Sequence, residues 1–178
     1  QALAQAPLDD VLAAWSGLGY YRRARMAHQC AQAVVQRHGG QFPRTRQGLE
    51  TLPGIGRSTA AAIAAFCFGE REAILDGNVK RVLTRHSGFD GDLSRGSEVK
   101  RLWDVAEALL PESAIEPYTQ GLMDLGASLC LARKPRCLVC PVADDCKARQ
   151  AGDPERYPVV TAKLKRSERT SVWLWLEH

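Results

Sequence analysis

The chain contains six cysteines, and four of them lie close together: Cys130, Cys137, Cys140 and Cys146. Their C-x6-C-x2-C-x5-C spacing is too local for a disulfide framework that staples a whole secreted fold. Four thiolates in one short segment can instead bind zinc or an iron-sulfur cluster. Zinc sites usually combine two short C-x2-4-C knuckles, and only one gap is short here, so the spacing favours a [4Fe-4S] cluster. We call residues 130–146 the cluster loop.

Apolar residues recur at helical spacing in most of the remaining chain. The predicted helices span residues 8–16, 20–38, 57–68, 78–87, 97–110 and 115–129. Glycine or proline follows several of them, and no convincing alternating strand precedes the C-terminal tail. The fold class is therefore predicted to be all-α. Cys30 and Cys67 lie inside two alanine-rich helices, where we expect both to be small buried hydrophobic side chains.

The composition changes after the last cysteine of the array. Residues 1–150 are expected to form the folded core, and residues 151–170 are polar and charged, with glycine and proline, as is typical of a linker. Within 171–178, the stretch SVWLWL is prone to form a β-strand and looks like the truncated start of a second domain. The chain begins with Gln1 rather than methionine and enters a helical segment at once, so we expect that a preceding segment is missing.

The length and charge of the chain permit a nucleic-acid partner. With 178 residues and 45% hydrophobic content, the chain can bury a sizeable core. Its net charge is only +4, but arginines and lysines are clustered, which matters more for a polyanionic partner than the total. No run of about 18 apolar residues and no signal peptide is present, which predicts a soluble intracellular protein without a membrane partner.

The segment LPGIGRSTA, residues 52–60, precedes an alanine-rich helix. Its two glycines allow a tight turn between helices and leave backbone N–H groups free at a helix N-terminus, where a phosphate oxygen fits, as in a helix-hairpin-helix DNA clamp. An ordinary helix-helix turn is the alternative, and the preceding proline and the following Arg57 favour the clamp. The DNA-binding candidates here are Gly54, Ile55, Gly56 and Ser58.

Asp76 lies in the segment ILDGNVKRVL, directly ahead of a predicted helix. The positive end of the helix dipole stabilises a negative charge there, and two roles fit such a carboxylate. It can cap the helix, or it can face the sugar of a flipped nucleotide and stabilise an oxocarbenium-like transition state, as in glycoside hydrolysis. Lys80 follows one turn later and either reaches the DNA backbone or an abasic sugar, or lies on a solvated helix face.

Two basic segments add further candidates for DNA binding. The cluster loop carries Arg133, Lys134 and Arg136, which a cluster would hold at its rim, where they can bind phosphate. Solvated charges are the alternative. In GLGYYRRAR, residues 17–25, the ring of Tyr20 can enter the base stack while neighbouring arginines hold phosphate. A buried tyrosine is the alternative there.

The segments GLGYYRRAR, LPGIGRSTA and ILDGNVKR, followed by the cysteine array, occur in this order in the helix-hairpin-helix DNA glycosylase superfamily. The chain resembles the MutY-type adenine DNA glycosylases of that superfamily over nearly its whole length. The resemblance implies an all-α helix-hairpin-helix core, with Asp76 as the catalytic aspartate and the four cysteines as [4Fe-4S] ligands. It also implies that Tyr20 intercalates beside the damaged guanine, that Gly54 and Gly56 bind phosphate, and that residues 171–178 begin a domain that helps recognise 8-oxoguanine.

The activity implied by the resemblance is hydrolytic removal of adenine mispaired with 8-oxoguanine or guanine in double-stranded DNA, by a monomeric enzyme in the bacterial cytoplasm, associated with the nucleoid. Endonuclease III-type enzymes share the cluster spacing and the hairpin, but they carry an attacking lysine where this chain has Ser58, so a monofunctional glycosylase is expected. The resembling enzymes protonate adenine with a glutamate in a segment before Gln1, so we expect the chain as given to be poorly active. An endonuclease III-type lyase and a noncatalytic iron-sulfur DNA-binding module are the alternatives.

Overall fold

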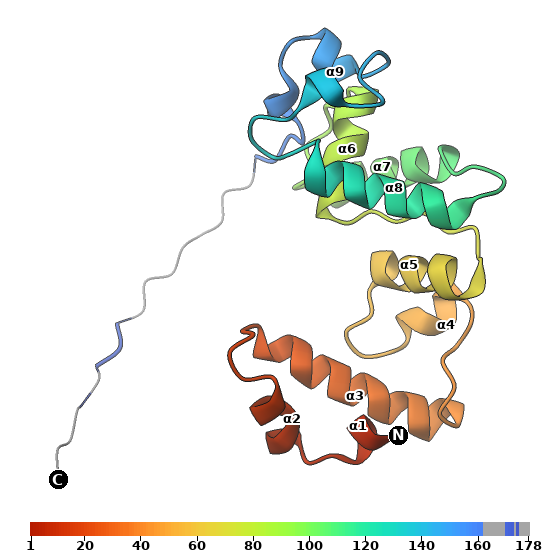
Figure 1. Cartoon of the computed structure of the whole chain (residues 1–178), viewed down its shortest axis with the longest axis vertical. Coiled ribbons are helices and arrows are strands. Elements are labelled where there is room, and N and C mark those ends of the chain that lie inside the picture. The colour runs from red at the N-terminus through yellow and green to blue at the C-terminus, as the bar shows by residue number, and fades with distance from the viewer. Residues whose placement is uncertain (162–169, 173, 175–178) are drawn as a thin grey trace.

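The computed structural model describes residues 1–161, 170–172 and 174 (Figure 1). The elements are α1 (Ala2–Gln5), α2 (Leu8–Ala14), α3 (Tyr21–His38), α4 (Arg46–Glu50), α5 (Arg57–Phe68), α6 (Gly77–Ser87), α7 (Gly96–Ala108), α8 (Ile115–Ser128), η1 (Cys137–Val139), α9 (Lys147–Gln150) and η2 (Pro154–Arg156). All six predicted helices are present, with ends shifted by no more than two residues. The described residues contain no β-strand, so the predicted all-α class is confirmed. None of the described helices is both long and apolar enough to span a membrane.

Helix α5 lies between two hydrophobic cores at the middle of the molecule (Figure 1). One face of α5, with Ala60 and Ala64, packs with α3 and α4. The adjacent face, with Ala61 and Ala65, packs with α6, α7 and α8. A helix that is apolar on more than one face is normally buried, and alanine lets neighbouring helices approach closely. The alanine-rich sequence of α5 therefore suits a helix that joins both halves of the fold.

Three short helices, α1, α4 and α9, lie outside the segments predicted to be helical. Helix α4 is the first helix of the hairpin, and its N-cap is Thr45, whose hydroxyl accepts a hydrogen bond from the N–H of Gly48 at 3.2 Å. Gly48 weakens the helical pattern, but a Cβ at that position would lie 2.7 Å from the Cβ of Pro43. So short a helix is marginal in isolation, so tertiary packing rather than helix propensity decides its formation.

Residues 153–161 fold back onto the core. The carbonyl oxygen of Val159 accepts a hydrogen bond from the N–H of Leu93 at 2.9 Å, and Asp92 accepts hydrogen bonds from the amide and the hydroxyl of Thr161. The first part of the predicted linker therefore has fixed contacts with the loop between α6 and α7. Residues 162–169 and half of the predicted strand, 171–176, lie outside the described residues, so the division into domains stays a prediction.

Candidate functional site

The turn between α4 and α5 holds the two glycines of the predicted DNA clamp. Gly54 has a φ of 78°, and a Cβ there would lie 2.6 Å from the Cβ of Met26 on α3, so only glycine fits. Gly56 is the N-cap of α5, both glycines are exposed, and Ile55 between them packs onto the core of α3, α4 and α5. The first N–H groups of α5 have no partner within the helix, and they lie at its positive end, which suits a phosphate oxygen.

Tyr20 lies beside this turn, in the loop between α2 and α3. It is 82% exposed, which rules out the alternative of a buried tyrosine. Tyr20 and Gly54 line one pocket of about 550 Å³ together with Arg22, Arg23 and Met26. The fold therefore brings three predicted DNA-binding features to one surface. They are the ring of Tyr20, which we call the wedge, two arginines, and Gly54 of the predicted clamp.

Asp76 caps α6, because its Oδ1 accepts a hydrogen bond from the N–H of Val79 at 2.7 Å. The carboxylate is half-buried and lines a pocket with Ser58, the second residue of α5. The Oγ of Ser58 accepts a hydrogen bond from the N–H of Leu75 at 3.0 Å, which joins the hairpin to the residue before Asp76. No hydrogen-bond partner is found for Oδ2 of Asp76 among the described residues, so capping involves only one of the two carboxylate oxygens. Lys80 lies one turn later on α6 and is half-buried.

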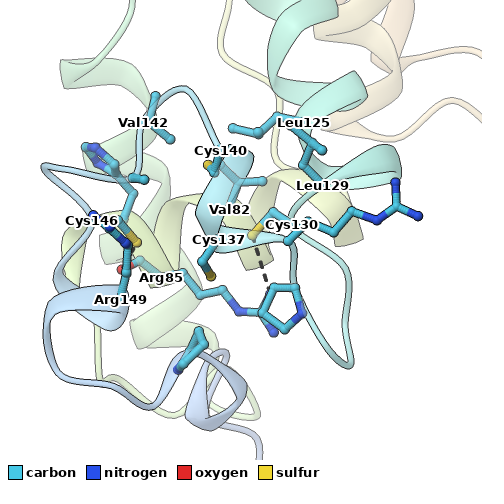
Figure 2. A pocket seen from close by; sticks show the side chains of 15 residues that line it. Val82, Arg85, Leu125, Leu129, Cys130, Cys137, Cys140, Val142, Cys146 and Arg149 are labelled. Atoms are coloured by element: carbon cyan, nitrogen blue, oxygen red, sulfur yellow. Dashed lines mark hydrogen bonds between the residues drawn. The ribbon is translucent and has the colours of Figure 1, made fainter.

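The four cysteines of the array line one pocket between α6, α8 and the cluster loop (Figure 2). Burial raises the pKa of the Cys137 thiol, and the sulfurs of Cys146, Cys130 and Cys140 raise it further, whereas the guanidinium of Arg85 lowers it. Four thiolates this close together need a cationic group, which iron supplies. A [4Fe-4S] cluster takes four cysteine thiolates, and the four cysteines that line this pocket supply that set. The donor set therefore fits the predicted cluster.

A buried arginine that the sequence patterns did not reveal holds the cluster loop. Arg85 on α6 is only 2% exposed, and its Nη1 donates to the Sγ of Cys130 at 3.4 Å (Figure 2). The guanidinium also donates to the carbonyl oxygens of Leu131 at 2.6 Å and Ala132 at 3.1 Å. Its Nε donates to the carbonyl oxygen of Tyr157 at 3.2 Å. One side chain thus ties α6 to both the cluster loop and the C-terminal segment.

Arg81, one turn earlier on α6, makes a second set of contacts to the same region. It donates to the carbonyl oxygens of Cys130 at 2.7 Å and Gly126 at 2.6 Å, and to Oδ1 of Asn78 at 2.9 Å. The spacing of Arg81 and Arg85 places both on one helix face. That spacing is the only local signal in the sequence, because the partners on α8 and in the cluster loop lie 45 to 49 residues away.

The three cations predicted at the rim of the cluster loop, Arg133, Lys134 and Arg136, are all exposed. The backbone N–H of Lys134 donates to Oε1 of Glu155 at 2.9 Å, and Lys134 has a φ of 50°. The loop backbone is therefore held while the charged side chains face solvent. Their contact with phosphate stays a prediction.

Arg57 makes contacts that the sequence did not reveal, and one cysteine differs from its expected position. The guanidinium carbon of Arg57 lies 3.8 Å from the ring centroid of Trp103, and Arg57 pairs with Glu107. Arg57 therefore connects α5 to α7. Cys30 is buried as expected, but the same expectation for Cys67 is wrong: Cys67 is exposed, because α5 emerges from between the two cores near its C-terminal end.

Comparisons with known proteins give two family matches along the chain. Residues 1–108 match the HhH-GPD superfamily base excision DNA repair protein, and residues 130–146 match the iron-sulfur binding domain of endonuclease III. The second match coincides with the cluster loop and supports a [4Fe-4S] cofactor.

Several curated relatives are adenine DNA glycosylases. The relative from Buchnera aphidicola subsp. Acyrthosiphon pisum is 39% identical over 178 residues, which are 100% of this chain and 51% of the relative. The relative from Homo sapiens is 41% identical over 157 residues, 88% of this chain and 29% of the relative. The relative from Mycolicibacterium smegmatis is 42% identical over 156 residues, 86% of this chain and 51% of the relative. The chain thus spans about half the length of these relatives or less.

Two solved structures share the fold. A thermostable thymine-DNA glycosylase superposes with a TM-score of 0.73 at 31% identity, covering 84% of this chain and 69% of that chain. The endonuclease III of a non-covalent complex with DNA superposes with a TM-score of 0.71 at 25% identity and the same coverage.

Proposed function

Because the chain belongs to the HhH-GPD superfamily of base excision DNA repair proteins, we propose that this protein removes adenine mispaired with 8-oxoguanine or guanine from double-stranded DNA. The names of the relatives at 39% to 42% identity support adenine as the base. The single observation that carries the proposal is the position of Asp76. Its carboxylate is fixed at the N-terminus of α6, and it lines the same pocket as Ser58 at the start of the second hairpin helix.

In the proposed mechanism, the hairpin and the wedge hold the duplex while one nucleotide is extruded towards Asp76. The N–H groups at the start of α5 bind a phosphate, and the ring of Tyr20 fills the gap in the base stack. As the glycosidic bond breaks, the sugar gains positive charge, and the carboxylate of Asp76 stabilises it. The hydrogen bond from Val79 keeps the carboxylate in place without rearrangement during the reaction.

In this proposal Cys130, Cys137, Cys140 and Cys146 would hold a [4Fe-4S] cluster, which would make the cluster loop rigid when bound. With the loop fixed, its exposed cations Arg133, Lys134 and Arg136 present a constant charged edge to the DNA backbone. Arg85 on α6 also helps to hold the cluster loop in place, through its hydrogen bonds to the carbonyl oxygens of Leu131 and Ala132. A monomer that acts in the bacterial cytoplasm is part of the proposal.

The replacement Asp76→Asn tests the mechanism, because asparagine keeps an acceptor for the Val79 N–H but removes the negative charge. We expect a single-turnover rate on an adenine:8-oxoguanine duplex at least about 100-fold lower, with duplex affinity and melting temperature retained. Asp104→Asn is the matched control, since Asp104 is an exposed carboxylate on α7. An unchanged, measurable rate for Asp76→Asn would refute the catalytic role of Asp76, whereas no adenine release by either protein would favour a noncatalytic DNA-binding module. Because this chain is expected to be poorly active, the same pair of proteins is also compared in a version extended to the length of its relatives, and the two unsubstituted proteins together test that expectation.

An endonuclease III-type lyase is the second candidate, because an endonuclease III in complex with DNA shares the fold at a TM-score of 0.71. Ser58 argues against it, since a hydroxyl cannot form a Schiff base with the sugar. Its Oγ also accepts a hydrogen bond from Leu75, which gives the side chain a structural role. Borohydride trapping separates the two activities: efficient covalent capture on a thymine glycol duplex would establish the lyase, and cleavage of adenine without capture the hydrolase.

A further inference from the structure

The loop that carries Tyr20 has an unusual backbone. Gly17, Gly19 and Tyr20 have positive φ angles of 82°, 67° and 51°. Glycine adopts this left-handed region readily, but a tyrosine does so only at a cost in free energy, because its Cβ crowds the backbone. A residue kept in a strained conformation needs surrounding contacts that hold it there. The contacts around Tyr20 therefore show how the exposed ring is placed.

Trp15 closes the loop from the α2 side. It follows the last residue of α2 and is half-buried, and its indole Nε1 donates a hydrogen bond to the carbonyl oxygen of Gly19 at 2.9 Å. That carbonyl belongs to the peptide bond that leads into Tyr20. The hydrogen bond therefore fixes the orientation of the peptide plane immediately before the strained residue.

Arg23 closes the same loop from the α3 side. Its guanidinium carbon lies 5.5 Å from the ring centroid of Trp15 and 5.5 Å from that of Tyr20, within cation–π range of both rings. Its backbone N–H donates to the carbonyl oxygen of Tyr20 at 2.7 Å, in the first turn of α3. No such aromatic contact is found for the neighbouring Arg22 or Arg25 among the described residues. Arg23 therefore differs from the neighbouring arginines because its guanidinium contacts the rings of both Trp15 and Tyr20.

We propose that Trp15 and Arg23 are positioning residues that hold Tyr20 in its exposed, left-handed conformation before DNA binds. The inference rests on the proposed function, in which the ring of Tyr20 enters the base stack. A ring that is already fixed loses little conformational entropy when it enters the base stack. More of the favourable contact energy with the lesion pair therefore appears as tighter binding of the lesion duplex than of undamaged duplex. Arg23 then contributes to the preference for the lesion duplex because it holds Tyr20. The neighbouring Arg22 and Arg25 contribute to phosphate binding in any duplex.

The first test measures the ratio of dissociation constants for an undamaged duplex and for the adenine:8-oxoguanine duplex, using the cluster-loaded protein. Trp15→Phe keeps an aromatic ring but loses the N–H, and we expect the ratio to fall about 3- to 10-fold, as for the loss of one hydrogen bond. Arg23→Lys keeps the charge but loses the planar face, and it should lower the ratio in the same way. Arg22→Lys should weaken both duplexes alike and leave the ratio unchanged.

A double-mutant cycle shows whether Trp15 acts through Tyr20. In a Tyr20→Ala background, Trp15→Phe should have no further effect on the ratio, because the residue that it positions is gone. An equal effect of Trp15→Phe in both backgrounds would overturn the proposal, since the tryptophan would then act independently of the wedge.

The second test needs no DNA and separates this inference from the proposed function. Fluorotyrosine is incorporated at all four tyrosines, and the ¹⁹F resonance of Tyr20 is assigned by its loss in Tyr20→Phe. We expect a shifted resonance and a changed linewidth in Trp15→Phe and Arg23→Lys at unchanged melting temperature. An unaltered Tyr20 resonance in both variants would refute the positioning role. A wild-type protein without any preference for the lesion duplex would refute the proposed function instead, and the ¹⁹F spectra would still decide the positioning role.

Discussion

Replacing Arg85 by methionine should loosen the whole cluster loop. Methionine keeps an apolar stem of similar length, but the carbonyl oxygens of Leu131, Ala132 and Tyr157 and the sulfur of Cys130 lose their donor. Arg85 is only 2% exposed, so water cannot take the place of the guanidinium without rearrangement. Removal of one partner from a buried charged hydrogen-bond network costs about 3 to 5 kcal/mol. That is a large fraction of the 5 to 15 kcal/mol by which domains are typically stable.

The assay combines thermal unfolding with iron analysis of protein purified without oxygen. At roughly 2 to 4 °C per kcal/mol for a chain of this size, Arg85→Met should melt about 10 °C below the wild type. It should also retain fewer than the roughly four irons per chain that a full cluster requires. Arg101→Met is the control, because the side chain of Arg101 is 66% exposed and its ion pair with Glu98 should contribute less than about 1 kcal/mol. Equal melting temperatures and full iron content in Arg85→Met would refute the reasoning.

Two further predictions follow from the hairpin and from the C-terminal segment. Gly54→Ala should lower the free energy of unfolding by about 1 to 3 kcal/mol, because Gly54 has a φ of 78° and a Cβ there would lie 2.6 Å from that of Met26. Gly56→Ala should lower it by less than about 1 kcal/mol and mainly weaken DNA binding. Equal melting temperatures of the two variants would contradict this. Hydrogen bonds from Thr161 lower the pKa of the Asp92 carboxyl below its usual value of 3.8. The stability that the Asp92–Thr161 contact contributes is therefore fully present above pH 3.8 and is lost as the pH falls through the lowered pKa of the folded protein. Asp92→Asn should therefore speed hydrogen exchange of the Thr161 amide at pH 6, and equal exchange in variant and wild type at that pH would argue against the contact.

Much of the fold can be predicted from the sequence, because the patterns that indicate helices involve residues close together in the chain. Apolar spacing, together with the glycines that end α3 and α5, locates the long helices to within two residues, since a helix is built from contacts three and four residues apart. The same holds for the turn around Gly54 and for Asp76 ahead of α6, where a residue type at a fixed offset from a helix end indicates a cap or a clamp.

The sequence alone therefore determined the six longer helices, the cysteine spacing of the cluster loop and the residues whose side chains could take part in binding or catalysis. Only the tertiary structure decided which of these come together: Tyr20 with Gly54, Ser58 with Asp76, and Arg85 with the cluster loop. It also decided that Arg57 stacks on Trp103. The physical reason is that these contacts join residues far apart in the chain, and their geometry depends on how α5 packs between two cores, which no local pattern encodes.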